Sequence, residues 1–274
     1  MSTPLWTPTP ERIAASRLHG FLSRQGFADF SAAHRWSVDE PEAFWRAAWD
    51  EVGIVGDPGP TVLAPGPDLP TTRFFPEARL NVAENLLAGG RTGVDEQAPA
   101  LVFRSEDDTI RREVDRRELR HLVARLQQAL LAEGVGPGDH VAAWLPNLPE
   151  TYAVMLAAAS IGAVFTSTSP DFGADGVVDR FGQLEPPILF ACDAYAYGGR
   201  IHDRLGPLAE LRAALPSLRR VVVVPFLGDG GTGGVADAVT LDGFLTGTNA
   251  REPTFTALPF DHPWYVLFSS GTTG

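Results

Sequence analysis

The chain has 274 residues, of which 44% are apolar and 20% charged, with 28 Gly and 23 Pro. This is the composition of a turn-rich globular protein with a large core, and it excludes a disordered chain and a small disulfide-stapled scaffold. The net charge of −12 argues against a nucleic acid partner. All 22 basic residues are Arg, so the chain has no lysine amine for Schiff-base chemistry or for binding a phosphate.

The first ninety residues are rich in Trp and predict a helical region. Apolar residues recur at helical spacing over 41–52, with Asp39 or Ser37 available as the N-cap and Gly53 as the stop. A Pro- and Gly-rich linker is expected over 56–70, and a second short helix over 80–87. The Trp residues of this region are Trp6, Trp36, Trp45 and Trp49.

From residue 99 onward, strand and helix patterns alternate. Residues 101–104 and 109–114 predict a hairpin around an acidic turn. Alternation of this kind predicts βαβ crossovers and an α/β fold, with a mostly parallel sheet and flanking helices. We expect strands at 141–145, 163–166, 188–191, 219–225 and 265–268, and helices at 119–133, 149–161, 175–184 and 207–215.

An Arg-rich stretch at 104–125 could be mistaken for a nucleic acid site. It holds seven Arg, but six acidic residues lie among them, and Glu113 and Arg117 have the spacing of a helical ion pair. We therefore interpret the stretch as a solvated face.

The sequence favours a cytoplasmic protein without a membrane partner. Cys192 is the only cysteine, so no internal disulfide can form. Residues 1–20 contain no apolar run of the secretory type, and the longest uncharged apolar stretch, 153–165, is too short to span a bilayer.

The strongest chemical signal follows the apolar run at 264–268, which predicts a buried strand. Glycines after a strand let backbone N–H groups converge on an anion, and Ser and Thr hydroxyls add donors, so the pattern is typical of a phosphate cradle. An ordinary Gly/Ser/Thr loop is the alternative, and the missing lysine excludes a Walker loop. The cradle residues are Ser269, Ser270, Gly271, Thr272, Thr273 and Gly274.

The motif at 265–274 resembles the phosphate-binding signature of the adenylate-forming superfamily, which includes acyl-CoA synthetases, luciferases and peptide-synthetase adenylation domains. Residues 138–150 are similar to a segment shared across acyl-CoA synthetases. Residues 160–173 and 179–186 resemble the acetoacetyl-CoA synthetase branch, as do N-terminal stretches such as 78–87. The resemblance covers essentially the whole chain.

The resemblance implies a fold and two regions. The chain would be the N-terminal part of the large domain of an adenylate-forming enzyme, preceded by the Trp-rich helical extension. Residues 1–90 would be an acetyl-CoA-synthetase-like N-terminal region, and residues 91–274 the first part of an AMP-binding domain. The motif normally continues with Pro and Lys, so we expect that the chain ends inside the first ATP motif.

The resemblance also implies binding residues. Residues 269–274 would approach the phosphates of ATP, which enters with Mg²⁺. Gly198, Gly199 and Arg200 resemble a segment that contacts CoA in acetyl-CoA synthetases, where a basic side chain pairs with a phosphate. A solvated loop charge is the alternative for Arg200. No catalytic residue can be assigned.

Other motif matches carry less weight. Gly228, Gly230 and Gly233 fit the dinucleotide pattern G-x-G-x-x-G, but no suitable helix follows, so we interpret the stretch as a linker. The six His lack metal-ligand spacing, and we expect no protein-held metal.

The function that we expect is acetoacetate:CoA ligation, with acetoacetate, ATP and CoA as small-molecule substrates and with this chain inactive alone. A related ligase for acetate or propionate is one alternative. The other is a non-catalytic module that binds CoA or pairs with a separately encoded C-terminal half.

Overall fold

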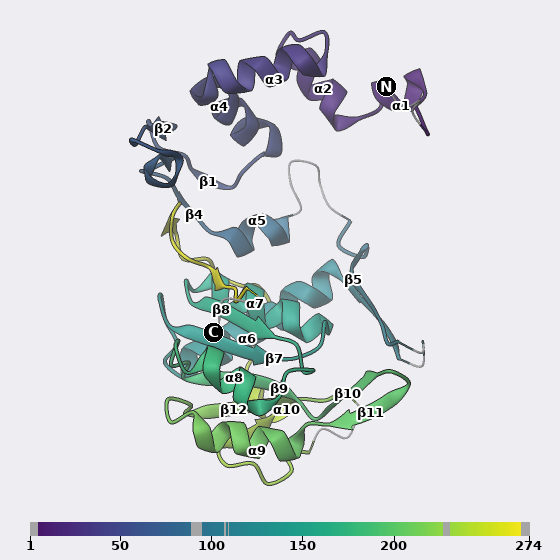
Figure 1. Ribbon diagram of the computed structural model, residues 1–274, viewed down its shortest axis with the longest axis vertical. Coiled ribbons are helices and arrows are strands. Elements are labelled where there is room, and N and C mark those ends of the chain that lie inside the picture. Colours follow the sequence, from purple (N-terminus) through teal and green to yellow (C-terminus); the bar gives the residue numbers. More distant parts are fainter. Residues whose placement is uncertain (1–4, 89–94, 107, 109, 227–230, 270–274) are drawn as a thin grey trace. The chain divides into compact units, whose positions relative to one another are not determined.

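The computed structural model describes residues 5–88, 95–106, 108, 110–226 and 231–269 (Figure 1). The chain forms two compact units, Met1–Ala78 and Arg79–Gly274. Each unit has its own packed interior and is considered separately below.

The described part of the first unit contains four helices, in agreement with the helical region expected there. The predicted helix over 41–52 is confirmed, and Gly53 ends it in the left-handed conformation with φ 72°. The predicted caps are wrong, because Ser37 and Asp39 lie inside the preceding helix; Glu40 is the N-cap, without a side-chain capping bond, and Pro41 occupies the first helical position. The helices are α1 (Pro10–Ala14), α2 (Arg17–Arg24), α3 (Phe30–Asp39) and α4 (Pro41–Val52).

Aromatic rings hold these short helices together. The ring of Phe44 meets Trp36 edge-on with centroids 5.6 Å apart, and it meets Trp45 at 5.1 Å. The expected linker over 56–70 contains only two-residue strands and the start of a 3₁₀ turn. The elements of the linker are β1 (Gly56–Asp57), β2 (Leu63–Ala64) and the start of η1 (Leu69–Thr71), and β3 (Arg73–Phe74) follows it.

The second unit contains a six-stranded sheet in the order β13-β12-β9-β7-β8-β15, and every neighbouring pair is parallel. The predicted α/β fold with a mostly parallel sheet is therefore confirmed. The strands are β7 (His140–Trp144), β8 (Val164–Thr168), β9 (Ile188–Cys192), β12 (Arg220–Val224), β13 (Ala238–Thr240) and β15 (Tyr265–Val266).

Helices cover both faces of this sheet. Val141 and Ala143 of β7 pack in the same cluster as α6 (Arg116–Ala132) and α7 (Pro149–Ser160). Ala142 and Trp144 point the other way and pack with α8 (Ala174–Phe181) and α9 (Leu205–Ala214). The short helices α5 (Val82–Ala88) and α10 (Leu241–Phe244) join the first cluster.

Three antiparallel pairs complete the second unit. The hairpin of β5 (Pro99–Arg104) and β6 (Arg111–Asp115) confirms the prediction around the acidic turn. The sequence analysis did not predict the hairpin of β10 (Ala194–Tyr197) and β11 (Arg200–Asp203), nor the pair β4 (Arg79–Leu80) and β14 (Leu258–Pro259).

The Arg-rich stretch spans β5, β6 and α6. The predicted helical pair of Glu113 and Arg117 is wrong, because Glu113 lies in β6 and α6 begins only at Arg116. Asp115 starts α6 through a capping box with Glu118. Arg112 forms an ion pair with the buried carboxylate of Glu150 on α7, so part of this face packs against the protein.

Replacing Phe190 with Ala tests the core. Phe190 is fully buried in β9, and its ring meets Phe244 edge-on at 5.6 Å. We expect Phe190→Ala to lower the free energy of unfolding by about 3–5 kcal/mol, through lost apolar contact and a cavity. Urea denaturation followed by circular dichroism measures this. Val102→Ala, at a side chain 53% exposed, should change it by less than about 0.5 kcal/mol, and equal effects would contradict the assignment of the core.

Candidate functional site

The order in which strands are added to the sheet reverses at β7: β8 lies on one side of β7, and β9 lies on the other. The connection after β7 enters α7 on one face, while the connection after β9 leads to α9 on the other. In open parallel sheets, ligands bind beyond the carboxyl ends of the strands near such a switch point. The candidate site therefore lies at this edge of the second unit.

The predicted phosphate motif follows β15 at this edge. Phe165 N donates to Trp264 O at 2.9 Å, and Thr166 Oγ1 donates to Val266 O at 3.1 Å, so β8 holds β15. Ser269 is exposed and lies three residues beyond Val266. Ser270, Gly271, Thr272, Thr273 and Gly274 lie outside the described residues.

The prediction of a buried strand over 264–268 is wrong in part. β15 spans only Tyr265–Val266, and Tyr265 and Leu267 are 39% and 71% exposed. The physical reason is that β15 has β8 as its one neighbour in the described sheet, so its side chains have strand neighbours on one side only and stay partly exposed.

Arg180 brings positive charge close to the motif. Its guanidinium lies 4.5 Å from the ring centroid of Phe172 and 6.0 Å from that of Phe268, which directly precedes Ser269. Nη1 of Arg180 donates to Gly176 O at 2.6 Å. The sequence analysis missed this residue, because only the pairing of β15 with β8 brings Phe268 near α8.

The predicted CoA residues lie on the tip of the hairpin β10–β11, which projects from the side of the α/β unit (Figure 1). Gly198 and Gly199 form the turn with φ 60° and 70°, a conformation that glycine adopts without strain. Arg200 is exposed and pairs with Tyr197 across the turn. Gly199 N donates to Glu106 Oε2 at 3.2 Å. The two predicted groups lie on different elements: Arg200 lies at the β10–β11 turn, and Ser269 follows β15.

A stack of side chains ties the base of this hairpin to the sheet. The guanidinium of Arg204 lies over the rings of Tyr195 and Trp144, at 4.7 and 5.5 Å, and donates to the Tyr195 hydroxyl at 2.9 Å. The ring of His202 stacks on the ring of Tyr195, its partner across the hairpin, with centroids 5.0 Å apart. The sequence analysis missed the cluster, although the alternation of Tyr195 with Tyr197 and of Arg200 with His202 and Arg204 was a readable strand signal.

A buried carboxylate orders the neighbouring strand ends. Asp193 Oδ1 accepts bonds from Ala194 N at 2.8 Å and from Phe226 N at 2.7 Å, which joins the ends of β9 and β12. Burial raises the pKa of the adjacent Cys192 thiol to about 12, and the negative charge of Asp193 adds to this effect. Cys192 is therefore a protonated core residue at neutral pH and no nucleophile.

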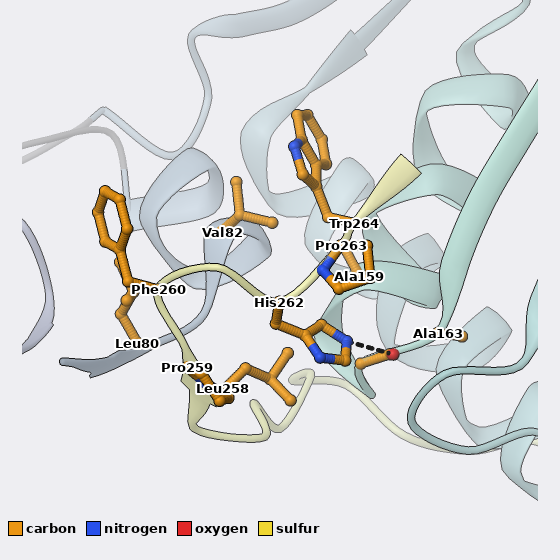
Figure 2. A pocket seen from close by; sticks show the side chains of 11 residues that line it. Leu80, Val82, Ala159, Ala163, Leu258, Pro259, Phe260, His262, Pro263 and Trp264 are labelled. Atoms are coloured by element: carbon orange, nitrogen blue, oxygen red, sulfur yellow. Dashed lines mark hydrogen bonds between the residues drawn. The ribbon is translucent and has the colours of Figure 1, made fainter. Parts of the chain in front are cut away.

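A small apolar cavity of about 210 Å³ lies at the opposite edge, where β8 and β15 begin. Figure 2 shows its lining, including Leu258, Phe260 and Trp264 of the segment that leads into β15. His262 Nε2 lies 2.8 Å from Gly162 O and joins that segment to the turn before β8.

Within the described ranges, no cluster of three or more His, Cys, Asp or Glu side chains could hold a metal ion. The same residues include no helix of the length and apolarity needed to cross a membrane.

Comparison with known proteins agrees with this geometry. The profile of the family described as "AMP-binding enzyme" matches residues 92–274, and that of "Acetyl-coenzyme A synthetase N-terminus" matches residues 30–86. An acetoacetyl-coenzyme A synthetase from Rhizobium meliloti is 47% identical over 99% of this chain, and one from Danio rerio is 35% identical over all of it. The solved structure of acetoacetyl-CoA synthetase from Streptomyces lividans matches the whole chain with 41% identity and a TM-score of 0.88.

The fold is thus that of the N-terminal domain of an adenylate-forming enzyme. The chain belongs to the AMP-binding enzyme family, and its similarity to acetoacetyl-CoA synthetases is confirmed. It spans 42% of the length of the Rhizobium, Danio and Streptomyces proteins.

The buried thiol gives a prediction for this edge of the sheet. With a pKa near 12 instead of the ordinary 9.0, Cys192 carries about a thousandfold less thiolate at pH 8. We expect iodoacetamide to label the native chain at least about a thousandfold more slowly than the chain in 8 M urea, as counted by mass spectrometry. Cys192→Ser should show no labelling, and rapid labelling of the native chain would contradict burial of the thiol.

Proposed function

We propose that this chain supplies the first part of an acetoacetate:CoA ligase that uses MgATP. The observation that carries the proposal is the match of the whole chain, at 41% identity and a TM-score of 0.88, to the acetoacetyl-CoA synthetase of Streptomyces lividans. The order of a parallel strand followed by Ser-Ser-Gly-Thr-Thr-Gly supports it further.

The proposed reaction has two steps. A carboxylate oxygen of acetoacetate attacks the α-phosphorus of ATP, a P–O bond forms, and the bond to pyrophosphate breaks. The thiol of CoA then loses its proton to solvent, its sulfur attacks the acyl carbon to form a C–S bond, and AMP leaves with the oxygen of the broken C–O bond. Both steps bring negative charges together, so they need fixed donors and positive charge.

We assign three roles to the residues of this chain. Residues 269–274 bind the ATP phosphates through backbone N–H groups and hydroxyls. Arg180, beside Phe268, adds positive charge there. Arg200 on the glycine turn pairs with a phosphate of CoA, with Gly198 and Gly199 allowing close approach of the backbone.

We also assign the two regions of the chain and the cellular compartment. Residues 1–90 act as the N-terminal region and residues 91–274 as the first part of the AMP-binding domain, in a cytoplasmic enzyme. Because these 274 residues include no lysine, any lysine in the reaction comes from other residues. We infer that such a lysine would be supplied by a further stretch of the same protein or by a separately encoded C-terminal half.

A chimera tests the function. Residues 1–274 are joined to the remaining part of the Rhizobium meliloti synthetase, and acetoacetate-dependent exchange of pyrophosphate into ATP is measured. We expect exchange in the chimera and none with the 274-residue chain alone, because these residues span only 42% of the matched synthetase and do not include the expected acyl pocket. Acetate and propionate should support at least about tenfold less exchange. A folded, monodisperse chimera without exchange would overturn the proposal.

The CoA assignment has a separate test in the same chimera. We expect Arg200→Gln to raise the KM for CoA about tenfold, the effect of losing one charge-assisted contact, and to leave pyrophosphate exchange unchanged. Arg251→Gln, a matched change at another exposed arginine, should alter neither quantity. An unchanged KM for CoA in Arg200→Gln would show that Arg200 is only a solvated charge.

A further inference from the structure

The segment that leads into β15 differs from the other connections of the sheet. A helix that packs on the sheet precedes β8, β9 and β12, whereas residues 248–264, here called the return segment, contain only the two-residue strand β14. β15 itself pairs through two residues, Tyr265 with Phe165 and Val266 with Thr166. So short a ladder places a strand weakly, so the return segment must be held by other groups.

Gln127 of α6 binds the return segment as a neighbouring strand would. Its Oε1 accepts from Thr254 N at 3.0 Å, and its Nε2 donates to Thr254 O at 2.5 Å. Nε2 also donates to Ser160 Oγ, at 2.7 Å. The side chain of Gln127 is only 4% exposed, so these bonds form away from water.

Asn81 makes a second tie from the start of α5. Its Nδ2 lies 3.0 to 3.1 Å from three carbonyl oxygens, those of Ala159, Ser160 and Thr256. Its Oδ1 accepts from Ala83 N at 2.9 Å and from Glu84 N at 3.3 Å, so the same side chain caps α5. Asn81 is 1% exposed.

These ties lie on one continuous path to the phosphate motif. Thr256 N donates to Ser160 O at 2.9 Å. His262 is next along the chain and bonds Gly162 O. Two residues later, Trp264 O accepts from Phe165 N. Figure 2 shows His262 turned toward that carbonyl beside Ala163. These bonds join the return segment to the end of α7, to the turn before β8 and to β8 itself.

We propose that Asn81 and Gln127 are positioning residues, which fix the return segment and thereby place β15 and the phosphate motif beginning at Ser269. This inference rests on the proposed function. Neither residue reaches the reacting atoms: both act at the amino edge of the sheet, and β15 carries their effect to the carboxyl edge.

Hydrogen exchange on the 274-residue chain tests the inference with Asn81→Ser. Serine still caps α5 but loses the two N–H groups of Nδ2 that face the three carbonyl oxygens. We expect the amides of Thr256 and Phe165 to exchange at least about tenfold faster, while amides of β9 and β12 stay within about twofold. Gln127→Met, which keeps the length without the polar atoms, should have the same local effect on Thr254.

Asp115→Ser is the matched control, because Asp115 caps α6 through Glu118 N and the change leaves the return segment bound. It should leave exchange at Thr256 and Phe165 unchanged. Faster exchange over the whole sheet in both Asn81→Ser and Gln127→Met would show a merely structural role and overturn the proposal. Unchanged exchange at Thr256 and Phe165 would overturn it equally.

Kinetics of the chimera separate positioning from stability. Asn81→Ser should raise the KM for ATP about tenfold and leave the KM for acetoacetate unchanged, because the return segment leads to the motif to which we assign ATP and not acetoacetate. Equal changes in both KM values would contradict the inference. An inactive parent chimera would overturn the proposed function instead. Hydrogen exchange on the 274-residue chain would still decide whether Asn81 and Gln127 hold β15.

Discussion

Burial of the parallel sheet on both faces is the constraint on which the second unit depends. Residues 141–144 of β7 have no exposed surface, and β8 and β9 flank the strand on either side. Backbone groups in such a strand can only be satisfied by the ladders, and alternate side chains must enter two different apolar layers. The helices are therefore divided between the two faces, and the loops that can carry function are confined to the edges of the sheet.

Several buried polar side chains among the described residues join elements of the second unit. Asp193 joins the ends of β9 and β12, Glu150 receives Arg112 from the neighbouring hairpin, and Asn81 and Gln127 bind the return segment. Each of these side chains has partners for its buried oxygen or nitrogen atoms, as the high desolvation penalty of unpaired polar groups requires. Together they place strand ends that apolar packing alone would leave free to shift.

Arginine carries the positive charge of both candidate binding regions. Arg180 lies between aromatic rings near β15, and Arg200 stands on the exposed turn of a hairpin whose base is held by Arg204. A planar guanidinium stacks flat on rings and presents two parallel N–H donors to a phosphate, whereas an ammonium group is a compact charge without this fork. The absence of lysine from these 274 residues thus shapes how the chain can bind phosphates.

The sequence by itself determined the fold class and the family, because strands buried on both faces appear as apolar runs between amphipathic helices, and because the motif after residue 265 is specific. It placed α4 and α7 to within a residue. It did not reveal that β15 is an edge strand, that Arg180 lies near Phe268, or that Asn81 and Gln127 bind Thr256 and Thr254. Only the tertiary structure decided these, because each joins residues far apart in the chain, and periodicity records only which way a side chain faces, not which partner it meets.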